Sequence, residues 1–357
     1  MIIPDIKRSY YQYKKHIKIG HFAPTLAQKI LFICMFFILP FTIPFKYIYK
    51  KRLKYKLLVL PFSDKEPMRT LINRLNKKKN FKIVVKPKSY WIAPIKLYQD
   101  FFILLVKSPQ WTICNLDFFG ALSIKISQYY GYKCKYGIDR VLIFQEYSFY
   151  SSYLTYIIES DGGRLYNLMH GIPGKEASFF RFSKCFVWEE YFKNFYIHNG
   201  ALKDQFMIVD SVYHTELKKQ VEHLTGSKRY DIVYVLQGDE YSNKRYKELI
   251  LDLLKFFQER YHRKVALKPH PIYRDKIATD SFVMLDGSIY DIFQSSELVI
   301  SQFSTVLYDA KSIGKKVLAI LPKDMQYLVG YLDDSQVAVD MDDAKEKILD
   351  LLKKEMQ

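Results

Sequence analysis

Cysteine is scarce in this chain, whose 357 residues include only Cys34, Cys114, Cys134 and Cys185. None stands in a Cys-x-x-Cys pair or beside clustered histidines, so the spacing supports neither a zinc site nor a disulfide framework. Four scattered cysteines in a chain of this size predict buried or free thiols in a reducing compartment.

Glycine and proline are also sparse, with 14 and 13 residues, and the chain contains no low-complexity tract and no repeat of fixed period. This composition argues against disorder and against a solenoid. Gly-x-Gly-x-x-Gly, Walker and His-Glu-x-x-His motifs are absent as well. The length and the hydrophobic content of 49% are sufficient for two domains with separate cores.

Negative charge is in short supply: 37 acidic residues face 55 Lys and Arg, which gives a formal net charge of +18. Such chains usually meet nucleic acid, anionic lipid or phosphorylated ligands. The Lys and Arg are concentrated in the first sixty residues and in residues 73–82, whereas the later part is nearly balanced. This distribution favours attachment to an anionic surface, and no nucleic-acid partner is expected.

One uncharged run, Ile30–Phe45, is bracketed by Lys29 and Lys46. It is shorter than the roughly 20 residues that a spanning helix needs, and Pro40 and Pro44 interrupt it. It has neither the cleavage site of a signal peptide nor a charge asymmetry that would set an orientation. We expect a monotopic or re-entrant insertion at the cytoplasmic face of the inner membrane. The alternative is a buried helix and strand.

Apolar strand-like runs alternate with helix-like runs along the rest of the chain. Such alternation predicts parallel sheets with right-handed crossovers, and hence an α/β fold. The expected domains are a basic and apolar membrane-associating segment (1–54) and two Rossmann-like domains (55–226 and 227–357). We expect strands at residues 55–62, 81–88, 140–148, 164–174, 230–238, 264–271, 297–304 and 315–321, and helices at 68–80, 149–160, 243–261, 288–296, 305–314 and 343–356, with residues 185–201 passing from strand to helix.

Three polar clusters stand where predicted strands end, which is where parallel sheets bind ligands. The first contains Lys268 and His270, whose cation and imidazole can neutralise a diphosphate. In the second, Ser304 and Thr305 begin a helix whose free N–H groups can bind phosphate, and Asp309 lies one turn further, within reach of a sugar hydroxyl. The alternatives are a surface loop and a simple helix cap.

The third cluster is "LMHGIPG", where His170 ends a strand in the other domain. His170 is the candidate general base, with Glu146 as the fallback, and a structural turn histidine is the alternative. The pair Asp340 and Asp342 has the spacing of an Asp-x-Asp metal motif. Because it stands at the start of the last helix, we interpret it as a cap, and no metal site is expected.

"LMHGIPG", "CFVWEEYFKNFYIHNGA", "LKPHP" and "YDIFQSSELVISQFSTVLYDAKSIGKKVLAI" together resemble the blocks of bacterial surface-polysaccharide transferases of GT-B architecture. The group includes transferases of sialic-acid-like and Kdo sugars and CDP-glycerol glycerophosphotransferases. The resemblance covers roughly residues 140–321. It implies that the two Rossmann-like domains face a cleft, with residues 55–226 as the acceptor domain and residues 227–357 as the nucleotide-sugar donor domain. It implies a catalytic role for His170 and donor-phosphate binding by His270, Ser304 and Thr305.

Sialyltransferases of this group carry an acidic-acidic-Gly motif, but here Ser160 separates Glu159 from Asp161. We therefore expect both carboxylates in a turn between a helix and a strand rather than at a catalytic centre.

The resemblance implies a metal-independent glycosyltransferase without a cofactor. It would move a sugar from a nucleotide donor, with CMP-linked donors as candidates, to a lipid-linked, capsule or lipopolysaccharide saccharide. A CDP-alditol phosphotransferase of a teichoic-acid-like polymer and a non-catalytic membrane-bound or RNA-binding scaffold are the alternatives. The sequence names neither the sugar nor the acceptor.

Overall fold

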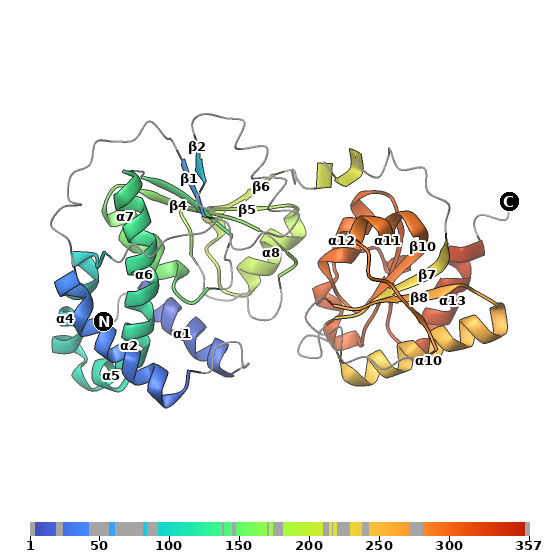
Figure 1. Ribbon diagram of the computed structural model, residues 1–357, viewed down its shortest axis with the longest axis horizontal. Coiled ribbons are helices and arrows are strands. Elements are labelled where there is room, and N and C mark those ends of the chain that lie inside the picture. The colour runs from blue at the N-terminus through green and yellow to red at the C-terminus, as the bar shows by residue number, and fades with distance from the viewer. Residues whose placement is uncertain are drawn as a thin grey trace. The chain divides into compact units, whose positions relative to one another are not determined.

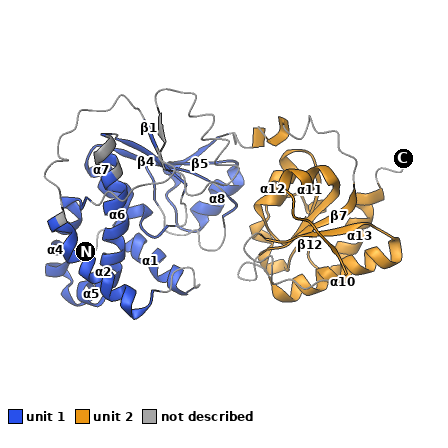
Figure 2. Cartoon of the chain, in the orientation of Figure 1, with its two compact units in different colours: residues 1–209 blue, residues 210–357 orange. Residues whose placement is uncertain are grey.

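The chain forms two compact units, residues 1–209 and 210–357, which are described separately (Figure 2). The expected domain boundaries at 54/55 and 226/227 fall outside the described residues. The computed structural model describes residues 4–18, 24–42, 57–60, 81–83, 92–137, 139–144, 148–169, 171–173, 181–209, 214–215, 217–219, 229–237, 243–270 and 281–353.

Unit 1 is built on a parallel six-stranded sheet in the order β2-β1-β3-β4-β5-β6 (Figure 1). In this sheet β1 lies inside the edge strand β2, and β3 to β6 follow on its other side in chain order. The strands are β1 (Leu57–Leu60), β2 (Phe81–Ile83), β3 (Arg140–Ile143), β4 (Arg164–Leu168), β5 (Lys184–Val187) and β6 (Phe206–Ile208).

Two pairs of helices in unit 1 are in close contact: α1 packs against α7, and α2 packs against α6. The helices are α1 (Pro4–Lys18), α2 (Leu26–Ile38), α4 (Ile95–Lys107), α5 (Pro109–Cys114), α6 (Leu116–Tyr136), α7 (Ser151–Ser160) and α8 (Glu190–His198).

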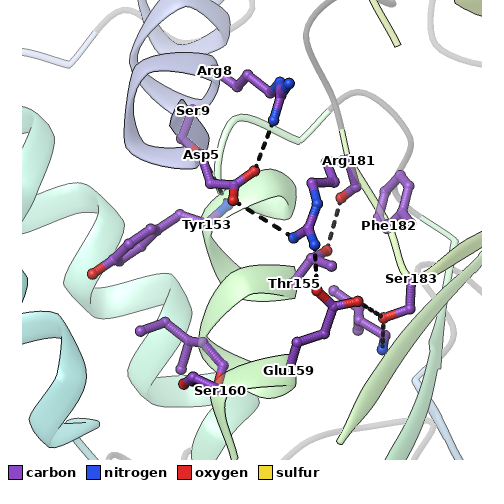
Figure 3. Close-up of polar contacts among 12 residues, drawn as sticks. Asp5, Arg8, Ser9, Tyr153, Thr155, Glu159, Ser160, Arg181, Phe182 and Ser183 are labelled. Carbon is purple, nitrogen blue, oxygen red and sulfur yellow. Dashed lines mark hydrogen bonds and ion pairs between the residues drawn. The ribbon is translucent and has the colours of Figure 1, made fainter. Parts of the chain in front are cut away.

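Charged side chains attach α1 to the sheet of unit 1 (Figure 3). The Asp5 carboxylate lies 3.1 Å from Arg8 and 3.6 Å from the Arg181 guanidinium, which also pairs with Glu159. Ser183 Oγ donates to Glu159 at 2.7 Å, and the Ser9 hydroxyl accepts the Tyr153 N–H at 3.2 Å. The basic N-terminal helix is therefore part of the folded unit.

The apolar run at Ile30 forms most of α2, which ends at Ile38, two residues before Pro40, and continues as a 3₁₀ turn through Thr42. Phe36 is its buried anchor, 4.6 Å from Phe101 of α4 between ring centroids. No helix in the described part of the chain is long and apolar enough to cross a bilayer.

Unit 2 is a second parallel six-stranded sheet, in the order β12-β11-β10-β7-β8-β9. When its strands are numbered 1 to 6 in chain order and the sheet is read from β9, the order is 3-2-1-4-5-6, that of the doubly wound fold. The direction of winding reverses between β7 and β10. The strands are β7 (Tyr230–Val235), β8 (Val265–Lys268), β9 (Val283–Met284), β10 (Ser296–Ser301), β11 (Lys316–Ile320) and β12 (Val337–Ala338).

Helices cover both faces of this second sheet (Figure 1). Ile232 and Tyr234 of β7 join Leu254 and Ile348 in one core with the helices α10 and α13. Val233 and Val235, the alternate residues of the strand, are buried too, as expected of strands buried on both sides. The helices are α10 (Lys244–Tyr261), α11 (Ile289–Ser295), α12 (Thr305–Ser312) and α13 (Met341–Lys353).

The expected α/β fold with parallel sheets is confirmed, and the glycine stops are too: Gly200 (φ 93°) follows α8 and Gly314 (φ 79°) follows α12. Strands were expected to be longer than they are, since β3 ends at Ile143 and β10 at Ser301. The expected helix at 68–80 lies outside the described residues. The short strands β6, β9 and β12 and the helices α4, α5 and α6 were not predicted.

Candidate functional site

Three neighbouring strands of unit 2 end at the same level. Lys268 at the end of β8 is in register with Val235 of β7, and the Ser301 hydroxyl at the end of β10 donates to the Val235 carbonyl at 2.9 Å. Since adjacent strands lie about 4.8 Å apart, the ends of β8 and β10 are separated by roughly 10 Å. The segments that carry His270 and Ser304 therefore leave the sheet on either side of β7, at the point where the winding reverses.

Lys268 is half-buried, and its ammonium group has defined acceptors at this edge. Nζ donates to the carbonyl oxygens of Gly287 at 2.8 Å and Leu285 at 3.2 Å, both in the loop after β9. The lysine thus holds this loop against β8 and keeps a positive charge beside the carboxyl ends of the strands. His270, two residues further on, is also half-buried.

An open pocket of about 330 Å³ runs along α11, from Leu285 and Gly287 to Tyr230, the first residue of β7, so it extends away from the carboxyl edge of the sheet. A Cβ at Gly287 would lie 2.7 Å from a carboxylate oxygen of Asp291, so a side chain there would displace that carboxylate. That carboxylate accepts from both the backbone N–H and the hydroxyl of Ser288 and so fixes the start of α11. The pocket walls are therefore held in place by the cap of a helix.

Ser304 is the N-cap of α12. Its backbone is extended (φ −160°, ψ 147°), and its hydroxyl accepts the Val306 N–H at 3.3 Å. The cap that the sequence offered as an alternative is therefore present, and the predicted phosphate role of Ser304 and Thr305 would be added to it. Both residues are half-buried at the carboxyl edge of the sheet.

Two glutamines, which sequence analysis missed, hold the loops around β7 and β10. Gln237 Oε1 accepts the Phe303 N–H at 3.3 Å. The buried Gln302 side chain accepts the Asn243 N–H at 2.8 Å and donates to the Asn243 carbonyl at 3.1 Å. These bonds connect the start of α10 to the end of β10, so the edge of the sheet is positioned by side-chain amides.

Asp309 is buried, and its Oδ1 lies 2.7 Å from His214 Nε2. Burial raises the pKa of the Asp309 carboxyl, and the His214 contact opposes that rise. The His214 ring also meets Tyr308 edge-on, with centroids 4.8 Å apart. Asp309 was predicted to reach a sugar hydroxyl, and the structure gives it a histidine partner that no local pattern in the sequence indicated.

The two residues predicted for the acceptor side, His170 and Glu146, lie outside the described residues. The strands that precede them in the chain, β4 and β3, are parallel neighbours in the sheet of unit 1. The predicted roles of His170 and Glu146 remain predictions.

Asp161 lies in the turn between α7 and β4, as expected, whereas Glu159 still belongs to the helix. Glu159 lies in the last turn of α7, bound to Arg181 and Ser183, and Asp161 follows as the C-cap, 3.4 Å from Lys133. Both therefore stand before β4, at the amino end of the sheet, on the edge opposite to the one where parallel sheets bind ligands.

The Asp340–Asp342 pair is a cap as expected, because Asp340 Oδ1 accepts the Asp343 N–H at 2.9 Å at the start of α13. In the described ranges, no group of three or more His, Cys, Asp or Glu side chains could hold a metal ion.

No protein-family model and no curated protein sequence matches the chain. Solved structures do. The UDP-GlcNAc 2-epimerase of Methanocaldococcus jannaschii, in complex with UDP-GlcNAc and UDP, is 11% identical with a TM-score of 0.53, covering 85% of this chain and 94% of that one. The Rickettsia bellii UDP-N-acetylglucosamine 2-epimerase is 11% identical with a TM-score of 0.54, covering 84% and 88%. The Neisseria meningitidis enzyme, bound to UDP-GlcNAc, is 14% identical with a TM-score of 0.52, covering 84% and 93%.

The chain has the GT-B fold. The three structures are UDP-GlcNAc 2-epimerases, and at 11–14% identity the likeness shows the fold alone. A GT-B fold hosts several chemistries, so the activity has to be argued from the site.

Proposed function

We propose that this GT-B protein is a metal-independent glycosyltransferase that binds a nucleotide-activated sugar at the carboxyl edge of the sheet in unit 2. The observation that carries the proposal is the convergence of β8, β7 and β10, which end at one level with Lys268, His270 and the N-terminus of α12 around them. A cation, an imidazole and a helix N-terminus are groups that stabilise a phosphate.

The phosphates of the donor would lie between His270 and the Ser304–Thr305 turn. The N–H groups of the first helical turn and the imidazole would donate to the phosphate oxygens, and the charge of Lys268 would act from the β8 side. Stabilising the departing phosphate is the main electrostatic work of such a reaction.

The acceptor hydroxyl would lose its proton to His170, with Glu146 as the fallback base, while it attacks the anomeric carbon. The bond from that carbon to the donor phosphate then breaks, and the nucleotide leaves with the electron pair. A sialic-acid- or Kdo-like sugar from a CMP donor, and a lipid-linked, capsule or lipopolysaccharide saccharide as acceptor, are the candidate substrates.

Two other enzyme activities use the same phosphate-binding groups. A CDP-alditol phosphotransferase would direct the attack to phosphorus, and the solved neighbours are epimerases of UDP-GlcNAc. Product analysis separates the three, because transfer extends an acceptor by a sugar or by an alditol phosphate, whereas epimerisation leaves the nucleotide sugar intact. A non-catalytic or RNA-binding scaffold would show none of these products.

The test is a thermal-unfolding panel with CMP, CDP, UDP, GDP and their sugar conjugates. A ligand at 100 times its dissociation constant stabilises the folded state by about 2.7 kcal/mol, which raises the Tm by roughly 5 °C or more for a unit of this size. We expect one nucleotide series to do so, and we expect His270→Ala to abolish the shift.

The matched control is His262→Asn, at an exposed histidine that ends α10 with φ 49°, a conformation that asparagine accepts. It should keep the full shift. If no nucleotide or conjugate raised the Tm of the unaltered protein, the proposal would be wrong.

A further inference from the structure

Three helices of unit 1 present large apolar side chains on their outer sides. Phe41 is 88% exposed and Val106 is 83% exposed, where a surface helix normally carries polar residues. We call this set the apolar face. It consists of Leu26, Ile30, Leu31, Phe37, Ile38 and Phe41 in and just after α2, Ile95, Phe102, Ile103 and Val106 of α4, and Ile113 of α5.

The exposed residues of α2 and α4 follow helical spacing, so each of these two helices contributes one stripe, and α5 adds Ile113. On α4 the stripe runs through Ile95, Phe102 and Val106, and on α2 through Ile30, Phe37 and Phe41. The exposed apolar residues therefore come from two segments of the chain: the uncharged run that begins at Ile30, and α4, which begins about 65 residues further along.

Contacts on the inner sides hold the helices together. Phe36 of α2 stacks on Tyr98 of α4 at 5.1 Å, and the Tyr98 hydroxyl donates to the Phe36 carbonyl at 3.1 Å. Trp111 of α5 and Phe101 of α4 both meet Phe119 of α6 edge-on. Figure 1 shows α2, α4 and α5 grouped at one end of unit 1. The helices that carry the exposed residues are thus packed together in unit 1.

Exposed cations border this surface. Lys7, Lys14 and Lys18 lie along one side of α1 and are exposed, as is Lys107 at the end of α4. The α1 side adjoins α5, because the Tyr10 ring lies 6.0 Å from Lys14 Nζ and 5.2 Å from the Trp111 ring. Over residues 1–54, eleven Lys and Arg stand against one acidic residue, Asp5, which is engaged with arginines.

We propose that the apolar face and the α1 lysines together bind an anionic bilayer, with α2 and α4 lying in the plane of the headgroups. Apolar side chains beside a row of lysines are complementary to a surface that is apolar inside and negative at its headgroups, whereas an apolar protein partner would not need the cations. Unlike the insertion expected from residues 30–45 alone, this surface uses α4 and α5. It does not depend on the proposed donor chemistry.

The test is flotation of the full chain with vesicles of phosphatidylcholine alone or with phosphatidylglycerol added. We expect binding to the anionic vesicles. The variant Phe37→Ser/Phe102→Ser/Val106→Ser should still fold, because these exposed side chains contribute little to folding. Its fraction bound to vesicles should fall at least tenfold, because the apolar side chains that enter the bilayer are lost. A variant with Lys7, Lys14 and Lys18 changed to Gln should lose about tenfold or more on anionic vesicles, and its binding should be less sensitive to salt.

The matched control is Ile208→Ser/Val283→Ser, which removes exposed apolar side chains from β6 and β9, outside the apolar face. This variant should bind vesicles as the unaltered chain does.

Native thiols supply a second readout. Cys34 of α2 and Cys114 of α5 are free, exposed and interspersed with the apolar face. Docking should slow their labelling by a polar maleimide, mapped by mass spectrometry, when anionic vesicles are added. Unchanged labelling on vesicles that do bind would overturn the assignment of this face.

Absence of vesicle binding would overturn the proposal outright. A stable dimer would also overturn the proposal if light scattering detected it without lipid, the triple Ser variant were a monomer, and no vesicle binding were measured. The face would then join two copies of the chain.

Discussion

The side chains of His214 and Asp309 meet across 95 residues of chain and are both buried. A buried carboxylate that loses its partner retains the full cost of desolvation. The pair therefore ties the short helical segment at His214 to α12, whose N-terminus is part of the proposed phosphate site.

We expect His214→Ala to lower the free energy of unfolding of unit 2 by about 3 kcal/mol at neutral pH. Burial alone already raises the Asp309 carboxyl pKa, and removal of the histidine removes the effect that opposes this rise. A carboxyl whose pKa is higher in the folded state favours folding when protonated, so its penalty grows as the pH rises above the unfolded value of 3.8.

The loss caused by His214→Ala should therefore be smaller at mildly acidic pH than at neutral pH, as measured by urea unfolding at several pH values. Asp309→Asn in the same background should recover part of it. A loss that is the same at every pH would contradict a role for the Asp309 charge.

At the scale of elements, the packing of α2 against α6 depends on Gly120 of α6. A Cβ on Gly120 would overlap the backbone carbonyl of Phe32, which cannot rotate away. We expect Gly120→Ala to cost unit 1 about 1–3 kcal/mol, because α2 must move off α6. Urea unfolding measures it.

The control is Lys125→Ala, on the exposed side of α6, which should change the stability by less than about 0.5 kcal/mol. If Gly120→Ala were as stable as the unaltered chain, the close contact of α2 and α6 would contribute nothing to the free energy of unfolding.

Much of the element order could be predicted, because the strands are short apolar runs that end at charges or glycines. Gly200 and Gly314 take the positive φ that a helix stop requires, and Asp340 caps its helix as predicted. The helices α4 and α5 were missed for a physical reason. Their outer positions, such as Phe102 and Val106, are apolar, and the contrast between two sides that indicates a surface helix is lost.

The candidate site was only partly predictable from its residues. Lys268, His270 and Ser304 follow apolar runs directly, so their place at strand ends could be inferred from local sequence. Gln302 and His214 act through partners that are distant in sequence, Asn243 and Asp309. No local pattern encodes such pairings.

At the scale of the whole molecule, the two units carry different chemistry. Unit 1 has the apolar face and its lysines, and unit 2 has the carboxyl edge proposed to bind the donor. The net charge of +18 by itself also suggests nucleic acid; the two proposals would account for it by a phosphate-containing ligand and an anionic surface. Both proposals are independent, and each can fail without the other.

The most direct test of the donor site is hydrogen exchange measured by mass spectrometry, with and without saturating CMP, CDP, UDP or GDP. We predict that the nucleotide that binds slows exchange at Lys268–His270 and at Phe303–Leu307, and that His270→Ala removes this protection. Protection confined to unit 1, or none with any of the four nucleotides, would contradict the account.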